Sequence, residues 1–265
     1  MNEDKIKELI EKSGNNFHYQ VVNFLREKGW FVSISPYYND IIGNRPREID
    51  IVADRQFDVK KPLSDRYKGA LLVRLFIECK YINKETVFWF DIKDKEKAIK
   101  KICKDTSLKP PSENNLINSH HYLKDNTVAK LFASLPDRIQ DNEPIYRALT
   151  QSLNAMVYYR SDHSIIPEEK LKSPTLENVK YPLIICSDFK NFFKVDSNDK
   201  RGYSEVCDNF QLEVNYAYRD IRGAAINEYF IIDIINFQKF NQFLEELEKT
   251  DIAIIGDILQ NSRAS

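Results

Sequence analysis

The stretch Ala70–Tyr81 (ALLVRLFIECKY) constrains the fold more than any other part of the chain. It is almost continuously apolar, a pattern typical of a long, mostly buried strand. Such a strand needs helices or another layer on either side of its sheet. We therefore expect an α/β protein with a central sheet that helices cover.

The rest of the chain supplies the elements for such layers. Apolar residues at helical spacing predict helices over Asn2–Lys12, Phe17–Gly29, Lys93–Lys104, Ile145–Tyr159 and Phe237–Lys249. Alternating or apolar runs predict strands over Trp30–Tyr38, Arg47–Arg55, Pro182–Phe189, Leu212–Tyr218 and Tyr229–Ile235. Between them, Asp105–Asn126 is rich in Lys, Pro, Ser, Asn and His and is expected to be a long loop.

This order predicts one α/β domain, a mixed β-sheet flanked by helices. We expect its core to span about residues 14–92 and 143–249, with an inserted loop and helical region over about 93–142.

Charged residues stand among the apolar residues of two of these strands. Glu78 and Lys80 share one face of the long strand, because alternate side chains point the same way. Asp50 lies in the preceding strand, on the face opposite to its core residues Ile49, Ile51 and Ala53. Two carboxylates that meet across a sheet repel each other unless a cation lies between them. Oxygen ligands of this kind suit Mg²⁺ or Mn²⁺, which complete their coordination with water and substrate phosphate.

An alternative needs no active site. Asp50, Glu78 and Lys80 could be ordinary charges on a half-exposed sheet face, with Glu78 and Lys80 merely paired. The combination of a strand Asp, a buried strand that ends in Glu-x-Lys and a helix before both favours a site.

These residues resemble the core of the PD-(D/E)xK nuclease superfamily, which has the restriction-endonuclease-like fold. The resemblance covers Gly14–Lys80: the helix GNNFHYQVVNFLREKGW, the strand REID that ends in Asp50, and FIECK with Glu78 and Lys80. It implies a metal-dependent nuclease in which Asp50 and Glu78 bind Mg²⁺ or Mn²⁺ and the Cys79 backbone carbonyl is a further ligand. It also implies that Lys80 is the catalytic lysine and that the reaction is phosphodiester hydrolysis.

The first helix departs from the family pattern. Many members have a Glu just after a Phe in this helix, where this chain has His18 after Phe17. An imidazole could serve as a base or an outer ligand, so His18 is a candidate catalytic residue and Gln20 a weaker one. A surface or capping histidine is the alternative. Gln151, in the helix after the catalytic strand, could also face the site.

Other features add little. His120 and His121 lie in the expected loop with no carboxylate or Cys at ligand spacing, which disfavours a metal site there. No P-loop, GxGxxG or GxSxG occurs, and there are only 7 glycines. The net charge of -1 neither supports nor excludes a nucleic-acid substrate.

We expect an endonuclease that acts on nucleic acid, with DNA as the first choice of substrate, in prokaryotic defence or restriction. A homodimer would suit cleavage of both DNA strands. The rival hypothesis is a nucleic-acid-binding or scaffolding protein that retains a nuclease fold with a weak or inactive site. The charged start of the chain and the absence of a long apolar run predict a soluble, cytoplasmic protein without a membrane partner.

Overall fold

A computed structural model describes residues 3–40, 45–59, 69–106, 115–134, 144–161, 164–196, 202–219 and 223–264. The α-helices of this part of the chain are α1 (Glu3–Lys12), α2 (Gly14–Glu27), α3 (Lys95–Asp105), α4 (His121–Lys124), α5 (Pro144–Tyr158), α6 (Phe240–Leu247) and α7 (Ala253–Ala264). Short 3₁₀ segments are η2 (Asn115–Ser119), η4 (Tyr159–Ser161), η5 (Glu168–Lys170) and η6 (Phe237–Lys239), and η7 (Glu248–Ile252) is a π-helical turn. The strands are β1 (Phe31–Ile34), β2 (Tyr37–Asp40), β3 (Arg45–Glu48), β4 (Ile51–Asp58), β5 (Ala70–Lys80), β6 (Thr86–Ile92), β7 (Thr127–Ser134), β8 (Thr175–Cys186), β9 (Phe192–Asp196), β10 (Ser204–Glu205), β11 (Phe210–Arg219) and β12 (Ala225–Asn236).

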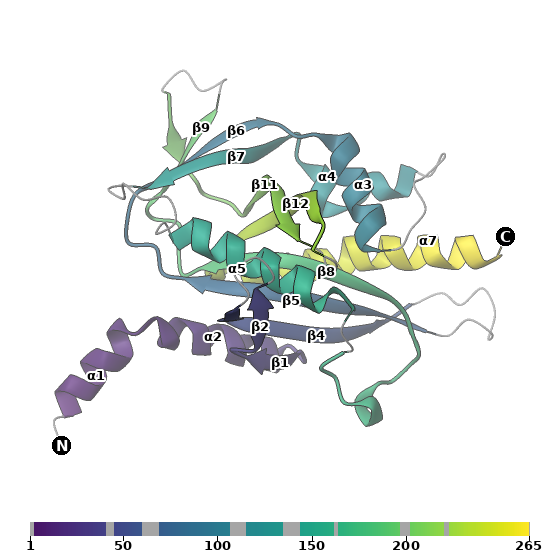
Figure 1. The fold of residues 1–265 in the computed structure, drawn as a ribbon, viewed down its shortest axis with the longest axis horizontal. Helices are drawn as coiled ribbons and strands as arrows, with labels where there is room; N and C mark the ends of the chain where they lie inside the picture. Colours follow the sequence, from purple (N-terminus) through teal and green to yellow (C-terminus); the bar gives the residue numbers. More distant parts are fainter. Residues whose placement is uncertain are drawn as a thin grey trace.

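The chain forms a single mixed α/β domain, in which helices flank a large sheet (Figure 1). The strand order of this sheet is β1-β4-β5-β8-β12-β11-β7-β6-β9-β10, and β2 and β3 form a separate hairpin. Strands β5, β8 and β12 are parallel to one another, whereas β4 runs antiparallel to β5. The expected α/β class and the flanked mixed sheet are therefore confirmed.

Two hydrophobic clusters cover the two faces of the sheet. The first packs beneath α2, α3, α6 and α7 and includes Ile77 of β5; the second packs beneath α5 and includes Phe76. Strand β5 is buried over nearly its whole length, as its apolar sequence predicts. Each fully buried Leu, Ile or Phe contributes roughly 1.5–3 kcal/mol of transfer free energy.

Helix α2 illustrates how the sequence sets an element. Ser13 caps it by accepting a hydrogen bond from the Asn15 amide at 3.1 Å. Its buried residues recur at helical spacing, and the chain leaves the helix at Gly29, whose φ of 80° favours glycine. Helix α1 extends away from the body of the molecule (Figure 1).

Two predicted strands are broken. Trp30–Tyr38 divides into β1 and β2 at Ser35, which has a φ of 51°. Arg47–Arg55 divides into β3 and β4 before Ile51. The alternation predicted across this break is wrong in one respect: Ile49 joins the cluster under α5, whereas Ile51 and Ala53 join the cluster on the other face.

The expected insertion contributes to the main sheet. Among the described residues of 93–142, β7 lies between β11 and β6 in the strand order. The predicted loop Asp105–Asn126 contains η2 and α4 in its described part, and β6 was not predicted. The predicted closing helix Phe237–Lys249 is a 3₁₀ turn, α6 and a π-helical turn, and continues into α7. No helix of the described residues is long and apolar enough to cross a membrane.

Candidate active site at the end of strand β5

Asp50 is held at the break between β3 and β4. Its carbonyl accepts a hydrogen bond from the Ser35 amide at 2.9 Å, and the Ile49 amide donates to the Pro36 carbonyl at 3.2 Å. These bonds join the two chain breaks at Ser35 and Asp50 to each other. Asp50 therefore lies just outside the β4–β5 ladder. The pairing of these strands begins one residue later, with Ile51 opposite Ile77.

The three predicted polar side chains meet at this point. Lys80 Nζ lies 2.7 Å from Glu78 Oε2 and 3.7 Å from Asp50 Oδ2. The Asp50 amide donates to Glu78 Oε1 at 3.3 Å, and the Cys79 amide donates to Asp50 Oδ2 at 2.8 Å. The structure thus brings Asp50, Glu78 and Lys80 together, while their part in catalysis stays a prediction.

Burial differs sharply among the three. The Glu78 side chain is 0% exposed, whereas those of Asp50 and Lys80 are 25% and 20% exposed. Burial raises the pKa of Glu78 to about 8, and the negative charge of Asp50 adds to that rise while Lys80 opposes it. Burial lowers the pKa of Lys80, but the two carboxylates outweigh it and raise that pKa. Two carboxylates thus share one ammonium group, and the charged form of Glu78 lacks full compensation.

Helix α5 packs against the strands that carry the site. Gln151 Nε2 donates to the Glu48 carbonyl at 3.1 Å, two residues before Asp50. Ser152 Oγ donates to the Phe76 carbonyl at 3.1 Å, two residues before Glu78. Gln151, expected to face the site, therefore contacts its backbone. The two bonds fix the strand segments that lead to both carboxylates.

For the side chains of Cys79 and His18, the structure gives no hydrogen bond or ion pair with Asp50 or Glu78 among the described residues. The Cys79 amide donates a hydrogen bond to the Asp50 carboxylate. Burial raises the pKa of the Cys79 thiol. The role of the Cys79 carbonyl as a metal ligand stays a prediction. His18 is half-buried, and its Nε2 has no hydrogen-bond partner among the described residues. No hydrogen bond or ion pair of the described part of the chain joins His18 to Asp50 or Glu78. Its catalytic role also stays a prediction.

A cavity of about 470 Å³ lies beside the end of β5. Its wall includes Gln20 of α2, together with Tyr81, Asn83 and Ser187. The Ser187 amide donates to the Lys80 carbonyl at 3.1 Å, which ties this cavity to the end of the strand. The described residues of this wall are uncharged and carry amide, hydroxyl and aromatic groups.

The sequence did not reveal Tyr38 as a neighbour of the site. Tyr38 is 2% exposed, and its hydroxyl has no hydrogen-bond partner among the described residues. Burial and the charge of Glu78 raise its pKa, so its hydroxyl lies within the electrostatic reach of that carboxylate. Alternation within Tyr37–Asp40 could have predicted an inward Tyr38, but only the β2–β3 hairpin places it over the site.

His120 and His121 have no carboxylate at ligand spacing in the sequence, but the fold brings a distant one to them. Both contact Asp251, which is 130 residues from His121 in the sequence.

The chain matches no protein-family model, no curated protein and no solved structure.

Proposed function

We propose that this protein is a metal-dependent nuclease of the restriction-endonuclease-like kind, which hydrolyses phosphodiester bonds of nucleic acid, with DNA as its substrate. The observation that carries the proposal is the convergence of Glu78 and Lys80 on β5 with Asp50, which directly precedes the paired strand β4. An ordinary charged sheet face does not require a fully buried Glu78 whose one lysine partner in the described part of the chain also pairs with a second carboxylate.

The donor set fits a hard divalent cation. Asp50 and Glu78 offer carboxylate oxygens, and their combined charge exceeds that of Lys80 by one unit. Asp50 and Glu78 would hold Mg²⁺ or Mn²⁺, with the Cys79 carbonyl as a further oxygen ligand. The bound ion would polarise the scissile phosphate and lower the pKa of a bound water.

The protein groups define the rest of the reaction. Lys80 lies beside both carboxylates, so its ammonium group would orient the attacking water and offset the negative charge that develops on the phosphate oxygens. The water oxygen forms a new bond to phosphorus as the bond to the leaving oxygen breaks. The leaving oxygen takes a proton from solvent, and the proton lost by the water returns to solvent.

Cleavage of supercoiled plasmid, single-stranded DNA and RNA, each with Mg²⁺, Mn²⁺ or excess chelator, tests the proposal. We expect DNA cleavage that requires the metal and that falls by at least about 100-fold in Asp50→Asn, Glu78→Gln and Lys80→Met. Glu96→Gln and Lys100→Met are matched controls, since these two exposed side chains pair with each other on α3. Binding of nucleic acid without cleavage by the folded wild-type chain would instead support the rival hypothesis of a binding protein with an inactive site.

A role in prokaryotic defence or restriction, and a homodimer that cuts both strands, belong to the same proposal. A nuclease of this role should linearise plasmid directly. The rate should depend on protein concentration in the range where a dimer forms.

A further inference from the structure

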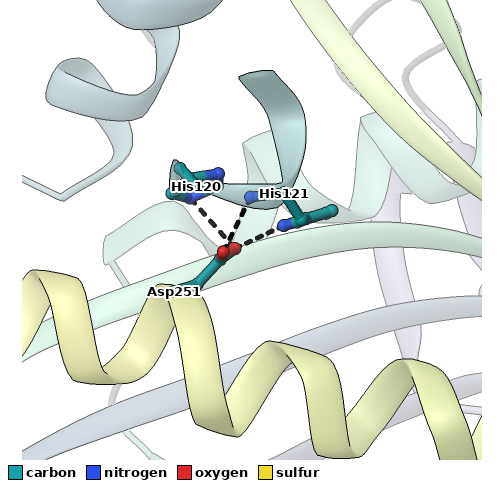
Figure 2. A group of neighbouring side chains, drawn as sticks. All are labelled: His120, His121 and Asp251. Carbon is teal, nitrogen blue, oxygen red and sulfur yellow. Dashed lines mark hydrogen bonds and ion pairs between the residues drawn. The ribbon is translucent and has the colours of Figure 1, made fainter. Parts of the chain in front are cut away.

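A second group of metal-ligating side chains lies where α4 meets the π-helical turn η7. His120 is the N-cap residue of α4, and Asp251 belongs to η7. One donor atom from each of His120, His121 and Asp251 lies within 4.8 Å of the other two. Figure 2 shows both imidazoles and the carboxylate converging from these two elements. We propose that these three residues form a binding site for a divalent transition-metal ion, with zinc as the ion that the donors fit best.

This site is separate from the candidate active site. Asp233, which contacts His121, pairs in register with Leu183, and Leu183 pairs with Ile77. Ile77 and Glu78 alternate along β5, so Glu78 points to the opposite face of the sheet. The two groups are thus two strands apart and on different faces.

The spacing of the donors suits one tetrahedral ion. His120 Nε2 lies 3.1 Å from Asp251 Oδ2, and His121 Nδ1 hydrogen-bonds the same carboxylate oxygen. Ligands bound at 2.0–2.1 Å in tetrahedral geometry are about 3.3 Å from one another. Two imidazole nitrogens with one carboxylate favour zinc and related ions, whereas magnesium prefers oxygen ligands alone.

The carboxylate of Asp251 is held rigidly. Its side chain is 0% exposed and accepts hydrogen bonds from the His121 amide at 2.8 Å and from the Tyr181 hydroxyl at 3.1 Å. Thr250 Oγ1 lies 3.2 Å from Asp251 Oδ1, the oxygen that also accepts from the His121 amide. The π-helical turn that carries Asp251 is a rare element, often found at functional sites. A fixed, fully buried carboxylate beside two imidazoles is a preformed ligand group.

Asp233 supplies the outer support that histidine ligands usually have. His121 Nε2 lies 3.1 and 3.2 Å from the two Asp233 oxygens, which fixes Nδ1 as the nitrogen that faces Asp251. Gln211 Nε2 in turn donates to Asp233 at 3.3 Å, and Lys93 Nζ donates to Gln211 Oε1 at 2.6 Å. This chain of hydrogen bonds sets both the tautomer and the orientation of His121.

A cavity of about 300 Å³ gives access to the site. Its wall includes His121, Asp233 and Gln211, with residues of α6 on the other side. The His121 side chain is 12% exposed, whereas that of His120 is 2% exposed. An ion can therefore enter past His121, and the cavity leaves room for a further ligand from solvent or a small molecule.

Protons compete with the ion for the same atoms. Burial lowers the pKa of His121, but Asp251 and Asp233 outweigh it and raise that pKa to about 10. His120 Nδ1 accepts a hydrogen bond from the Tyr122 amide at 3.1 Å, so the ring proton of His120 lies on Nε2. Metal binding would release the Nδ1 proton of His121. It would also move the ring proton of His120 to Nδ1, at the expense of that one capping hydrogen bond.

Zinc titration of the full chain after chelator treatment tests the proposal, with zinc alone as the probe. The Asp50→Asn background removes a carboxylate from the other proposed metal site, so the result does not depend on the proposed function. We expect one zinc per chain with Kd below about 1 µM, and a tetrahedral spectrum when Co²⁺ replaces zinc. Asp251→Asn and His120→Gln should weaken binding by at least about 100-fold, and Asp233→Asn by roughly 10–100-fold.

Glu96→Gln is the matched control, because it removes an exposed carboxylate from outside both proposed metal sites and should leave the zinc stoichiometry at one. Folding of every variant is checked by circular dichroism. If the ligand variants do not fold, zinc-dependent stabilisation and the Co²⁺ spectrum of the background protein decide. The proposal would be overturned if less than one zinc bound per chain and no tetrahedral Co²⁺ spectrum appeared, or if Asp251→Asn bound zinc as tightly as the background protein. The three residues would then form only a hydrogen-bonded cluster.

Discussion

Replacement of Glu78 by Gln distinguishes the effect of a buried charge on stability from the proposed role of that charge in metal binding. Glu78 has an ordinary pKa of 4.5 and a pKa of about 8 in the folded protein. Between these values the folded chain carries a proton at Glu78 that the unfolded chain has lost, so stability falls as pH rises. The fall is about 1.4 kcal/mol for each pH unit, or roughly 3 kcal/mol between pH 5 and pH 7. The amide of the Glu78→Gln variant has no such titration.

The free energy of unfolding of wild type and Glu78→Gln is measured in urea from pH 5 to pH 8.5, with chelator present. Trp30 is 4% exposed and gives a fluorescence signal for unfolding. At pH 5 the two proteins should differ little, because Glu78 is then protonated in the folded chain and the Gln amide oxygen can accept the same hydrogen bond from Lys80. As pH rises, the free energy of unfolding of the variant should increase relative to that of wild type, since other groups titrate alike in both proteins.

Added Mg²⁺ or Mn²⁺ extends the test to function. An ion that binds only the folded chain stabilises it by about 2.7 kcal/mol at one hundred times its Kd. Wild type should show this gain above neutral pH, and Glu78→Gln should lose most of it. A stability difference that stays constant from pH 5 to pH 8.5 would refute the charge argument. A metal gain of equal size in both proteins would refute the assignment of Glu78 as a ligand.

Three further changes give distinct results. Lys80→Met removes the group that opposes the rise in the Glu78 pKa, so the pH-dependent stability loss should extend above pH 8 and cleavage should cease; an unchanged stability profile would contradict the pairing. His18→Glu introduces an acidic residue in α2 and should preserve or raise metal-dependent cleavage, measured on plasmid; a loss as large as that of Lys80→Met would contradict the idea that His18 takes the place of an acidic residue. Arg74→Met leaves the 0% exposed Asp54 without its paired cation and should cost about 3–5 kcal/mol in urea unfolding; a cost under about 1 kcal/mol would show that the pair contributes little.

The sequence predicts the elements that are governed by local pattern. The apolar run that becomes β5 and the helical spacing of α5 are each strong enough to define an element on their own. Strand β7 is weaker, because much of it is not buried and its alternation is imperfect. Its place between β11 and β6 depends on pairings with residues far away in the chain. Local propensity cannot supply such a pairing.

The candidate active site was accessible to sequence reasoning because Glu78 and Lys80 lie on β5 and Asp50 directly precedes β4, the strand that pairs with β5. What the alternation missed is the break before Ile51. That break depends on the hydrogen bond from the Ser35 amide to the Asp50 carbonyl, a contact between two chain irregularities. The His120–Asp251 contact was inaccessible, because it depends on a π-helical turn near the end of the chain. No apolar period encodes such a turn.

Comparison with two other buried carboxylates, Asp54 and Glu228, shows how Glu78 differs from them. Asp54 accepts two hydrogen bonds from Arg74, each at 2.8 Å, and a third from the Ile165 amide at 2.9 Å, so its charge is matched within the protein.

Glu228 is equally well matched. It contacts Lys101 at 2.9 Å, Lys104 at 2.9 Å and Arg160 at 3.0 Å. Its pKa is lowered, because these cations and the Tyr218 hydroxyl outweigh burial. Among the described residues Glu78 pairs with one lysine, which it shares with Asp50, and its pKa is raised instead. A chain that fully neutralises two buried carboxylates but leaves a third short of positive charge, at the end of a strand and beside a partly exposed Asp50, has the electrostatics of a cation site. If Glu78 had only a structural role, its replacement by Gln would leave metal-dependent cleavage intact. Loss of metal-dependent cleavage with a gain in metal-free stability at high pH is therefore the combination that separates function from packing at this position.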